Sequence, residues 1–170
     1  MEPVHAAVST KLKQQTMNEK LEKIKNFRLF VLNQISSLTS EQLNFIPQGY
    51  NNNIIWNVGH LVAATQAICY KRAGLPVTID DKYFIPFLPT TKPDHFINNE
   101  EIEAIKALFI STMDTLQTDY ANKLFDNYTR SERIKEVYGI DVSNIDDAID
   151  FLLFHEGFHS GYITALIHLV

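Results

Sequence analysis

Cysteine is nearly absent from this chain of 170 residues: Cys69 is the only one. A single cysteine cannot form a disulfide within the chain, so the disulfide framework of small secreted domains is excluded. Cys69 falls in an apolar helical stretch, which favours a buried, unreactive thiol over a reactive one. The fold must therefore depend on an apolar core, for which the 45% of hydrophobic residues are sufficient.

Long hydrophobic runs are also missing. No stretch reaches the roughly 18 to 20 consecutive apolar residues that a membrane-spanning helix needs. The first residues, MEPVHAAVST, contain neither the basic nor the apolar segment of a signal peptide. We therefore expect a cytoplasmic protein that has no membrane partner.

Runs of one charge sign are absent as well. The net charge is −5, and the lysines and arginines are scattered along the chain. Proteins that bind nucleic acids or anionic membrane surfaces usually gather basic residues into a patch or a run. The sequence therefore predicts no nucleic-acid partner.

The apolar residues that are present recur every three or four positions, which is typical of amphipathic helices. No segment alternates with the period of two that a strand shows. Residues 1–17 are polar and aperiodic, and we expect them to be loosely ordered. The pattern predicts an all-α single domain over residues 1–170, a four-helix bundle with two long connections. The helical segments are approximately residues 18–38, 54–74, 99–120 and 143–170.

The same pattern predicts which side chains face the core. In the first segment the apolar stripe consists of Leu21, Ile24, Phe27, Val31, Ile35 and Leu38. The last segment is apolar on both sides, so we expect it to be the most buried of the four.

Two histidines in the last segment indicate a metal site. His155 and His159 are four residues apart, so they lie one above the other on a helix. Buried imidazoles need partners for their ring nitrogens, and one shared metal ion would satisfy both. The alternative is a pair of core histidines hydrogen-bonded to backbone or water.

A third histidine lies in the second helical segment. His60 follows Gly59, and a glycine in the middle of a helix costs about 1 kcal/mol relative to alanine. We therefore expect Gly59 to admit the close approach of a neighbouring element. Three histidine ligands leave positions for water or substrate, as in catalytic rather than structural metal sites.

The string His155-Glu156-x-x-His159 also matches the zinc-protease motif, in which Glu156 would be the general base. The extended form of that motif would need Gly at 162 and His at 165, where this chain has Tyr162 and Ala165. No edge strand is predicted that could bind an extended peptide. A protease is therefore disfavoured.

At these residues the chain resembles the DinB-like family of metal-binding four-helix bundles. The resemblance is carried by residues 55–60 (IWNVGH), residues 155–163 (HEGFHSGYI) and the loop at residues 84–87 (FIPF). The order and lengths of the helices fit across most of residues 18–170. In the family, one histidine of the second helix and an H-x-x-x-H pair of the last helix bind the metal. The matching positions here are His60, His155 and His159.

The resemblance implies a divalent metal ion (zinc, nickel or iron) and a homodimer. Characterised relatives include thiol transferases and a thiol-dependent isomerase, so a low-molecular-weight thiol is the implied cosubstrate. The sequence thus leads to two hypotheses. The first is a metal-dependent transferase or hydrolase that acts on a small-molecule substrate, and the second is a non-catalytic metal- or ligand-binding bundle.

Several side chains near the histidines are candidates for catalysis or substrate binding. Glu156 is the best candidate for a general base or for a partner of a metal ligand, although it could instead pair with another helix. Four further residues are expected to line or cover the pocket. They are Trp56, Asn57, Phe87 and Tyr162.

Overall fold

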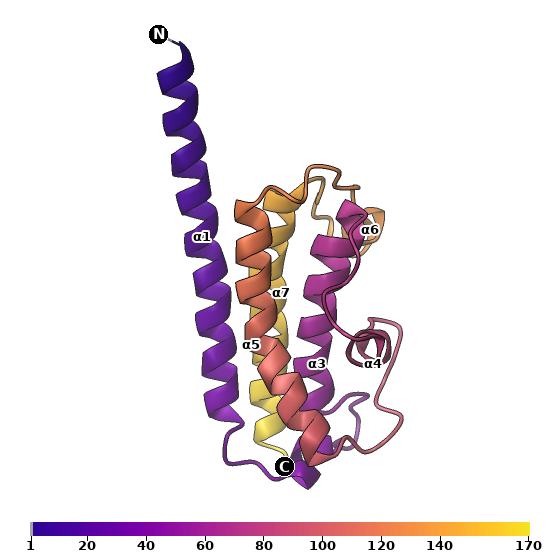
Figure 1. Ribbon diagram of the computed structural model, residues 1–170. Helices are drawn as coiled ribbons and strands as arrows, with labels where there is room; N and C mark the ends of the chain where they lie inside the picture. The colour runs from indigo at the N-terminus through magenta and orange to yellow at the C-terminus, as the bar shows by residue number, and fades with distance from the viewer. Residues whose placement is uncertain (1) are drawn as a thin grey trace.

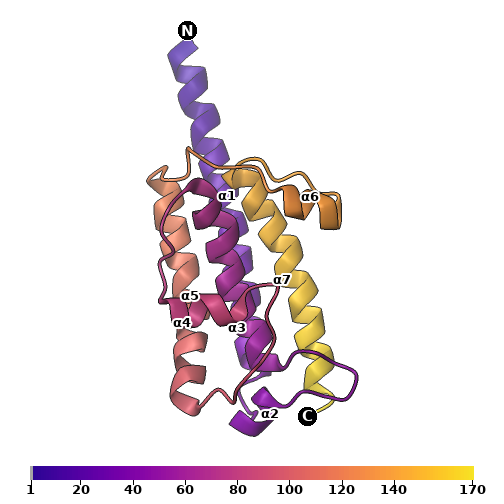
Figure 2. The same cartoon turned by 90° about the vertical axis from the view of Figure 1, so that its right-hand side faces the viewer.

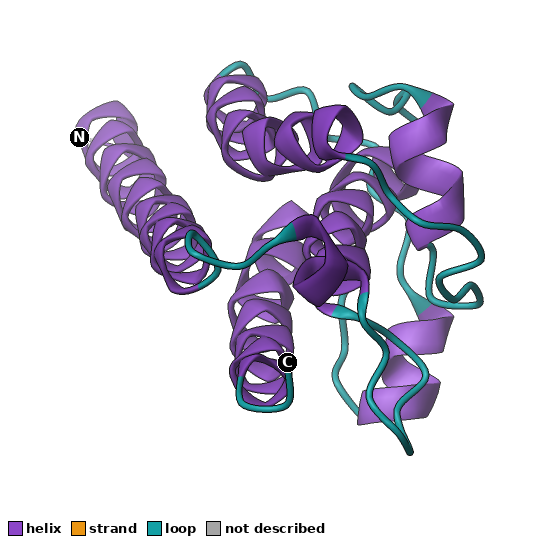
Figure 3. Cartoon of the chain, turned by 90° about the horizontal axis from the view of Figure 1, so that it is seen from below, coloured by secondary structure: helices purple, strands orange, loops and turns teal. Residues whose placement is uncertain are grey.

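The computed structural model describes the backbone of residues 2–170 and the side chains from residue 12 onward. The described residues form helices and loops, with no strand among them (Figure 3), and this confirms the predicted all-α fold. The α-helices are α1 (Glu2–Gln34), α2 (Ser40–Asn44), α3 (Ile54–Thr65), α4 (Asp81–Phe84), α5 (Asn99–Ala121), α6 (Glu132–Tyr138) and α7 (Ile145–Ile167). Three short segments have other helical geometry: the π-helix η1 (Gln66–Tyr70) and the 3₁₀-helices η2 (Lys71–Ala73) and η3 (Ile85–Phe87).

Helices α1, α3, α5 and α7 occupy the four predicted segments and pack side by side (Figures 1 and 2). Both α1 and α3 pack against α5 and α7, so α1 and α3 lie at opposite corners of the bundle. The short helices α2, α4 and α6 lie in the connections, for which the sequence predicts no helix. This arrangement places α3 beside α7, the two helices that carry the histidines.

Helix α1 is longer than its apolar pattern indicates. It begins at Glu2 and projects beyond the other long helices at the N-terminal end (Figure 1). The segment expected to be loosely ordered, residues 1–17, is therefore helical from Glu2 onward. Nothing between Val4 and Gln34 interrupts the helix, because this stretch contains neither proline nor glycine.

Within α1 the buried stripe differs from the predicted one at Phe27, and Leu38, beyond the end of the helix, is only half-buried. Phe27 is 45% exposed, whereas its neighbour Arg28 is completely buried. Leu21, Ile24, Val31 and the helix-terminal Ile35 are buried as predicted. The expectation for Phe27 was wrong because Arg28 occupies the inward position, where the Glu156 carboxylate, threonine hydroxyls and backbone carbonyls of other helices bind it.

Asparagine side chains begin three of the long helices. Asn53, Asn98 and Asn144 each accept hydrogen bonds from backbone N–H groups of the first turn of α3, α5 and α7. Such caps satisfy donors that have no partner within the helix. At the other end, Gly74 terminates the α3–η1–η2 run with φ +72°, a left-handed conformation that favours glycine.

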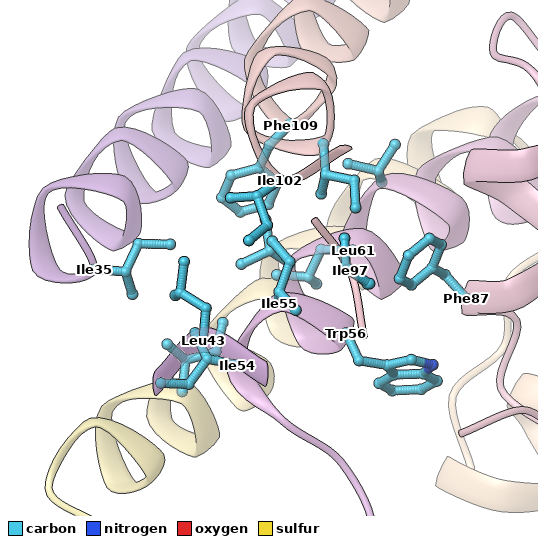
Figure 4. Close-up of a cluster of buried hydrophobic side chains, with 14 of the residues drawn as sticks. Ile35, Leu43, Ile54, Ile55, Trp56, Leu61, Phe87, Ile97, Ile102 and Phe109 are labelled. Atoms are coloured by element: carbon cyan, nitrogen blue, oxygen red, sulfur yellow. The ribbon is translucent and has the colours of Figure 1, made fainter. Parts of the chain in front are cut away.

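The core is centred on α3. All twelve residues of α3 are buried, and Ile54, Ile55 and Leu61 are completely so. Figure 4 shows side chains of α2, α5 and the connections, such as Leu43, Phe109 and Phe87, gathering around it. The prediction that the last segment is the most buried was wrong, because α7 exposes Phe154 and Phe158 while α3 is covered on every side.

The connection between η2 and α5 folds back on α3. It contains α4 and η3, and Trp56 donates an Nε1 hydrogen bond to the Pro86 carbonyl at 3.1 Å. The Phe87 ring lies against Gly59: a Cβ atom added at Gly59 would be 2.5 Å from Cδ1 of Phe87. The expected close approach at Gly59 is confirmed, and it brings the Phe87 backbone next to His60.

Two further features agree with the sequence. Cys69 is fully buried, and burial raises the pKa of its thiol to about 12, as expected of an unreactive cysteine. None of the described helices has the length and apolar character required to cross a membrane.

Candidate metal centre

His60, His155 and His159 lie together between α3 and α7. One ring nitrogen from each can be chosen so that all three atoms lie within 4.8 Å of one another. The ring centroid of His60 lies 5.3 Å from that of His155 and 4.7 Å from that of His159. His60 and His155 are buried and His159 is partly buried. The structure therefore brings together the three residues that the sequence predicts as metal ligands.

Hydrogen bonds outside the cluster orient two of these rings. Nδ1 of His60 lies 2.7 Å from the Phe87 carbonyl oxygen. Because a carbonyl can only accept, Nδ1 donates, and in the neutral ring Nε2 then carries the free lone pair. This is the arrangement in which protein histidines commonly bind metals.

His159 is held in the same way by an amide. Its Nδ1 lies 2.9 Å from Oδ1 of Asn57. The amide orientation of Asn57 is itself fixed, because its Nδ2 donates to the Asn53 carbonyl at 2.7 Å. Oδ1 of Asn57 therefore accepts the proton of His159, and Nε2 of His159 is left as the unprotonated nitrogen.

The third ring, His155, has a different environment. Its Nδ1 is buried and has no hydrogen-bond partner among the described residues. Leaving a buried polar nitrogen unpaired is unfavourable. A metal ion or an ordered water at the centre of the cluster is the kind of partner that a buried imidazole requires. The donor set thus fits a divalent transition metal, for which neutral imidazole is a good ligand.

The electrostatics of the cluster keep all three rings neutral. Burial is the main cause that lowers the pKa of His155 to about 2 and of His159 to about 3. The neighbouring histidines lower both values further. The pKa of His60 is also lowered by burial, although its bond to Phe87 partly opposes this. Metal ligands must be unprotonated, so the site is suited to bind an ion at neutral pH.

A pocket of about 390 Å³ opens beside the histidines, and all three line it. Trp56 forms one wall and stacks on His60 with ring centroids 5.0 Å apart. Phe151 and Phe158 line it from α7, and α6 contributes further lining residues, of which Tyr138 packs against Phe151. The histidines therefore face a space that a small molecule can enter.

The structure also shows where the four predicted substrate-binding residues lie. Trp56 lines the pocket. Asn57 and Phe87 are buried and contact the histidines from behind, with the Asn57 side chain on His159 and the Phe87 carbonyl on His60. Tyr162 packs edge-on against Tyr50, with ring centroids 5.7 Å apart, and is not among the pocket-lining residues.

Glu156 points into the bundle. Its Oε1 accepts hydrogen bonds from Nε of Arg28 at 3.0 Å and from Nη2 at 2.5 Å. Glu156 is 2% exposed and does not line the pocket. Burial raises the pKa of this carboxyl group, and the charge of Arg28 partly opposes the rise. Glu156 thus pairs with a charged residue on another helix, which was the alternative to a general base that the sequence left open.

Arg28 is the important residue near the site that the sequence analysis missed. Its guanidinium also donates to backbone carbonyls of α3 and α5 and to the hydroxyls of Thr65 and Thr112. The available signal was its position: Arg28 follows Ile24 by four residues and precedes Val31 by three, so it continues the inward-facing series.

A protein-family comparison agrees with the helical fold and the histidine cluster. The family model of the DinB superfamily matches residues 31–163, which include all three histidines. No curated protein and no solved structure matches this chain.

Proposed function

This chain belongs to the DinB superfamily, and we propose that it is a metal-dependent enzyme that acts on a small molecule. His60, His155 and His159 would hold one divalent ion. The observation that carries the proposal is the meeting of three neutral imidazoles from two helices at a pocket wall. A structural zinc site is usually closed by four protein ligands, whereas three histidines beside a pocket leave room for a substrate.

The residues around the cluster support a prepared site. The Phe87 carbonyl and the Asn57 amide fix the ring orientations of His60 and His159. Partners of this kind commonly raise metal affinity by about 10- to 100-fold. When bound, zinc, nickel or iron would act as a Lewis acid that lowers the pKa of a water or thiol.

The proposed reaction is transfer of a low-molecular-weight thiol to a small electrophile, or hydrolysis of a small molecule. In this scheme Trp56, Phe151 and Phe158 contact the substrate, and the pocket walls limit access of water. Glu156 has no part in proton transfer, because its carboxylate is buried against Arg28. It acts instead by fixing α7, so Glu156→Gln should retain the metal.

Activity can be tested with glutathione and 1-chloro-2,4-dinitrobenzene as model reactants, by following the thioether that forms as chloride leaves. We expect turnover by metal-loaded wild type, loss of turnover on chelation, recovery when the metal is restored, and no turnover by His159→Ala. A second assay follows the hydrolysis of a chromogenic ester and tests the hydrolase option. A protein that binds the metal and shows neither activity would favour the second hypothesis, a non-catalytic metal- or ligand-binding bundle.

A further inference from the structure

The charges that line the histidine pocket are all of one sign. The chain is acidic overall, with 20 aspartates and glutamates against 15 lysines and arginines. The pocket, by contrast, is lined by Arg72 and Arg133, and no described aspartate or glutamate lines it. Together with a metal cation on the histidines, this lining would attract an anion.

Arg72 is fixed beside the pocket by the backbone around it. Its Nη1 donates to the Arg130 carbonyl at 3.1 Å, and its own carbonyl accepts from the Thr129 N–H at 2.6 Å. One N–H of the guanidinium is used in this way. An arginine side chain has five N–H donors, so the remaining ones are available to a ligand.

Arg133, on α6, is exposed and forms no ion pair with any side chain that the structure describes. The adjacent acidic residue, Glu132, pairs instead with Arg130, whose Nε lies 3.9 Å from Oε1 of Glu132. Arg130 in turn is bound by both carboxylate oxygens of Asp141, at 2.7 and 2.9 Å. Two acidic groups near α6, Glu132 and Asp141, therefore pair with Arg130. Glu136, also on α6, forms no ion pair among the described side chains, so the charge of Arg133 is not neutralised by a paired carboxylate.

The rest of the pocket is mostly apolar. Ile68, Ile134, Phe151 and Phe158 contribute to its walls. Ligand sites commonly combine such walls with a few charged groups that set orientation. A guanidinium binds carboxylate or phosphate by charge-assisted, often bidentate, hydrogen bonds.

We infer that the pocket takes organic anions, with the acidic group bound between Arg72 and Arg133 and the apolar body against the aromatic wall. This inference rests on the proposed function in one respect: both assign ligand binding to the same pocket. Carboxylates and phosphorus acids share the chemistry that these arginines recognise.

The test is calorimetric titration of the full chain, both metal-free and zinc-loaded, with three probes of similar shape. Phenylacetate and phenylphosphonate are anions, and phenylacetamide is neutral. In metal-free protein we expect the anion that binds more tightly of the two to have at least about tenfold higher affinity than the neutral amide. One charge-assisted hydrogen bond contributes a free energy that corresponds to about this factor. The better anion identifies which acid the site prefers.

Arg133→Gln should reduce anion affinity by about tenfold and leave the amide unchanged. Because Arg133 is exposed and unpaired among the described side chains, this variant should fold normally, and circular dichroism checks that it does. Arg72→Gln should have the same effect. Lys135→Gln, which removes the same charge from an exposed position on α6 outside the pocket lining, is the matched control and should bind like wild type.

Equal affinity for anions and amide in metal-free protein would overturn the inference, as would failure of both anions to bind or unchanged anion affinity in Arg133→Gln. Anion binding by a wild-type chain that takes up no zinc, nickel or iron when these are supplied would refute the proposed metal centre but support the anion pocket. The two proposals therefore fail separately.

Discussion

Arg28 and Glu156 form an ion pair in the interior of the bundle, with Nη2 and Oε1 2.5 Å apart and both side chains essentially inaccessible to solvent. The pair joins α1 to α7 next to His155. The guanidinium also bonds to the Leu61 carbonyl on α3, next to His60, at 3.1 Å. One buried arginine thus ties together the two helices that carry the three clustered histidines.

Arg28→Met should strongly destabilise the fold, because it leaves the Glu156 carboxylate buried without its charged partner. Removal of one member of a buried ion pair typically costs about 3–5 kcal/mol. Urea unfolding measures the loss. The double variant Arg28→Met with Glu156→Leu should recover much of it, since replacement of a whole buried pair by apolar residues is often neutral.

Lys25→Met is the matched control on the same helix, because Lys25 pairs with Asp114 at the partly exposed surface. Surface pairs contribute little to stability. Equal destabilisation in Lys25→Met and Arg28→Met would contradict the special role given to Arg28.

Gly59→Ala should weaken metal binding. Its new Cβ would lie 2.5 Å from the buried Phe87 ring, so this ring must shift, and the backbone carbonyl of the same residue holds His60. Gly161→Ala is the control, since a Cβ there meets nothing within 4 Å and alanine should instead favour the helix by up to about 1 kcal/mol. Competition with a chelator gives the zinc affinity of each. Wild-type affinity in Gly59→Ala would mean that the contact does not support the site.

Asn57→Ala should lower metal affinity by about 10- to 100-fold, the usual effect of removing the hydrogen-bond partner of a ligating histidine. The variant removes the acceptor of His159 Nδ1 without touching a ligand. Asn51→Ala, at an exposed position, is the control. The same competition assay applies, and equal affinities in the two variants would count against the orienting role of Asn57.

The pH dependence of stability follows from the histidines. The pKa of His155 is lowered from 6.5 to about 2, so below pH 6.5 the unfolded chain binds a proton that the folded chain does not. The free energy of unfolding of metal-free protein should therefore fall as the pH drops from 7 to 5. Each histidine that is protonated in the unfolded chain but neutral in the folded chain contributes about 1.4 kcal/mol per pH unit to the slope of the free energy of unfolding.

Urea unfolding of metal-free protein at pH 7 and pH 5 measures this slope. His155→Asn should show a shallower slope than wild type. Asn51→Ala, which changes an exposed residue that has no titratable group, should keep the wild-type slope. Identical slopes for wild type and His155→Asn would show that His155 is not held neutral by burial.

The sequence allowed the three clustered histidines to be predicted but not the groups that orient them. His60, His155 and His159 could be recognised because helical spacing puts two on one face and because Gly59 signals a close neighbour. The Phe87 carbonyl is a backbone group whose position depends on how the connection folds, and no residue pattern encodes it. Arg28 was missed because a charged residue inside an apolar stripe is ordinarily solvent-exposed, and its partners come from three other helices.

The account depends most on the metal, so the most direct measurement is the metal content per chain by elemental analysis. Wild type and His159→Ala are compared, with His95→Asn as a control for the loss of an exposed histidine. We predict about one transition-metal ion per chain in wild type and in His95→Asn, and a large loss in His159→Ala. Absence of metal from wild type, even after incubation with zinc, nickel and iron, would contradict the three-histidine site.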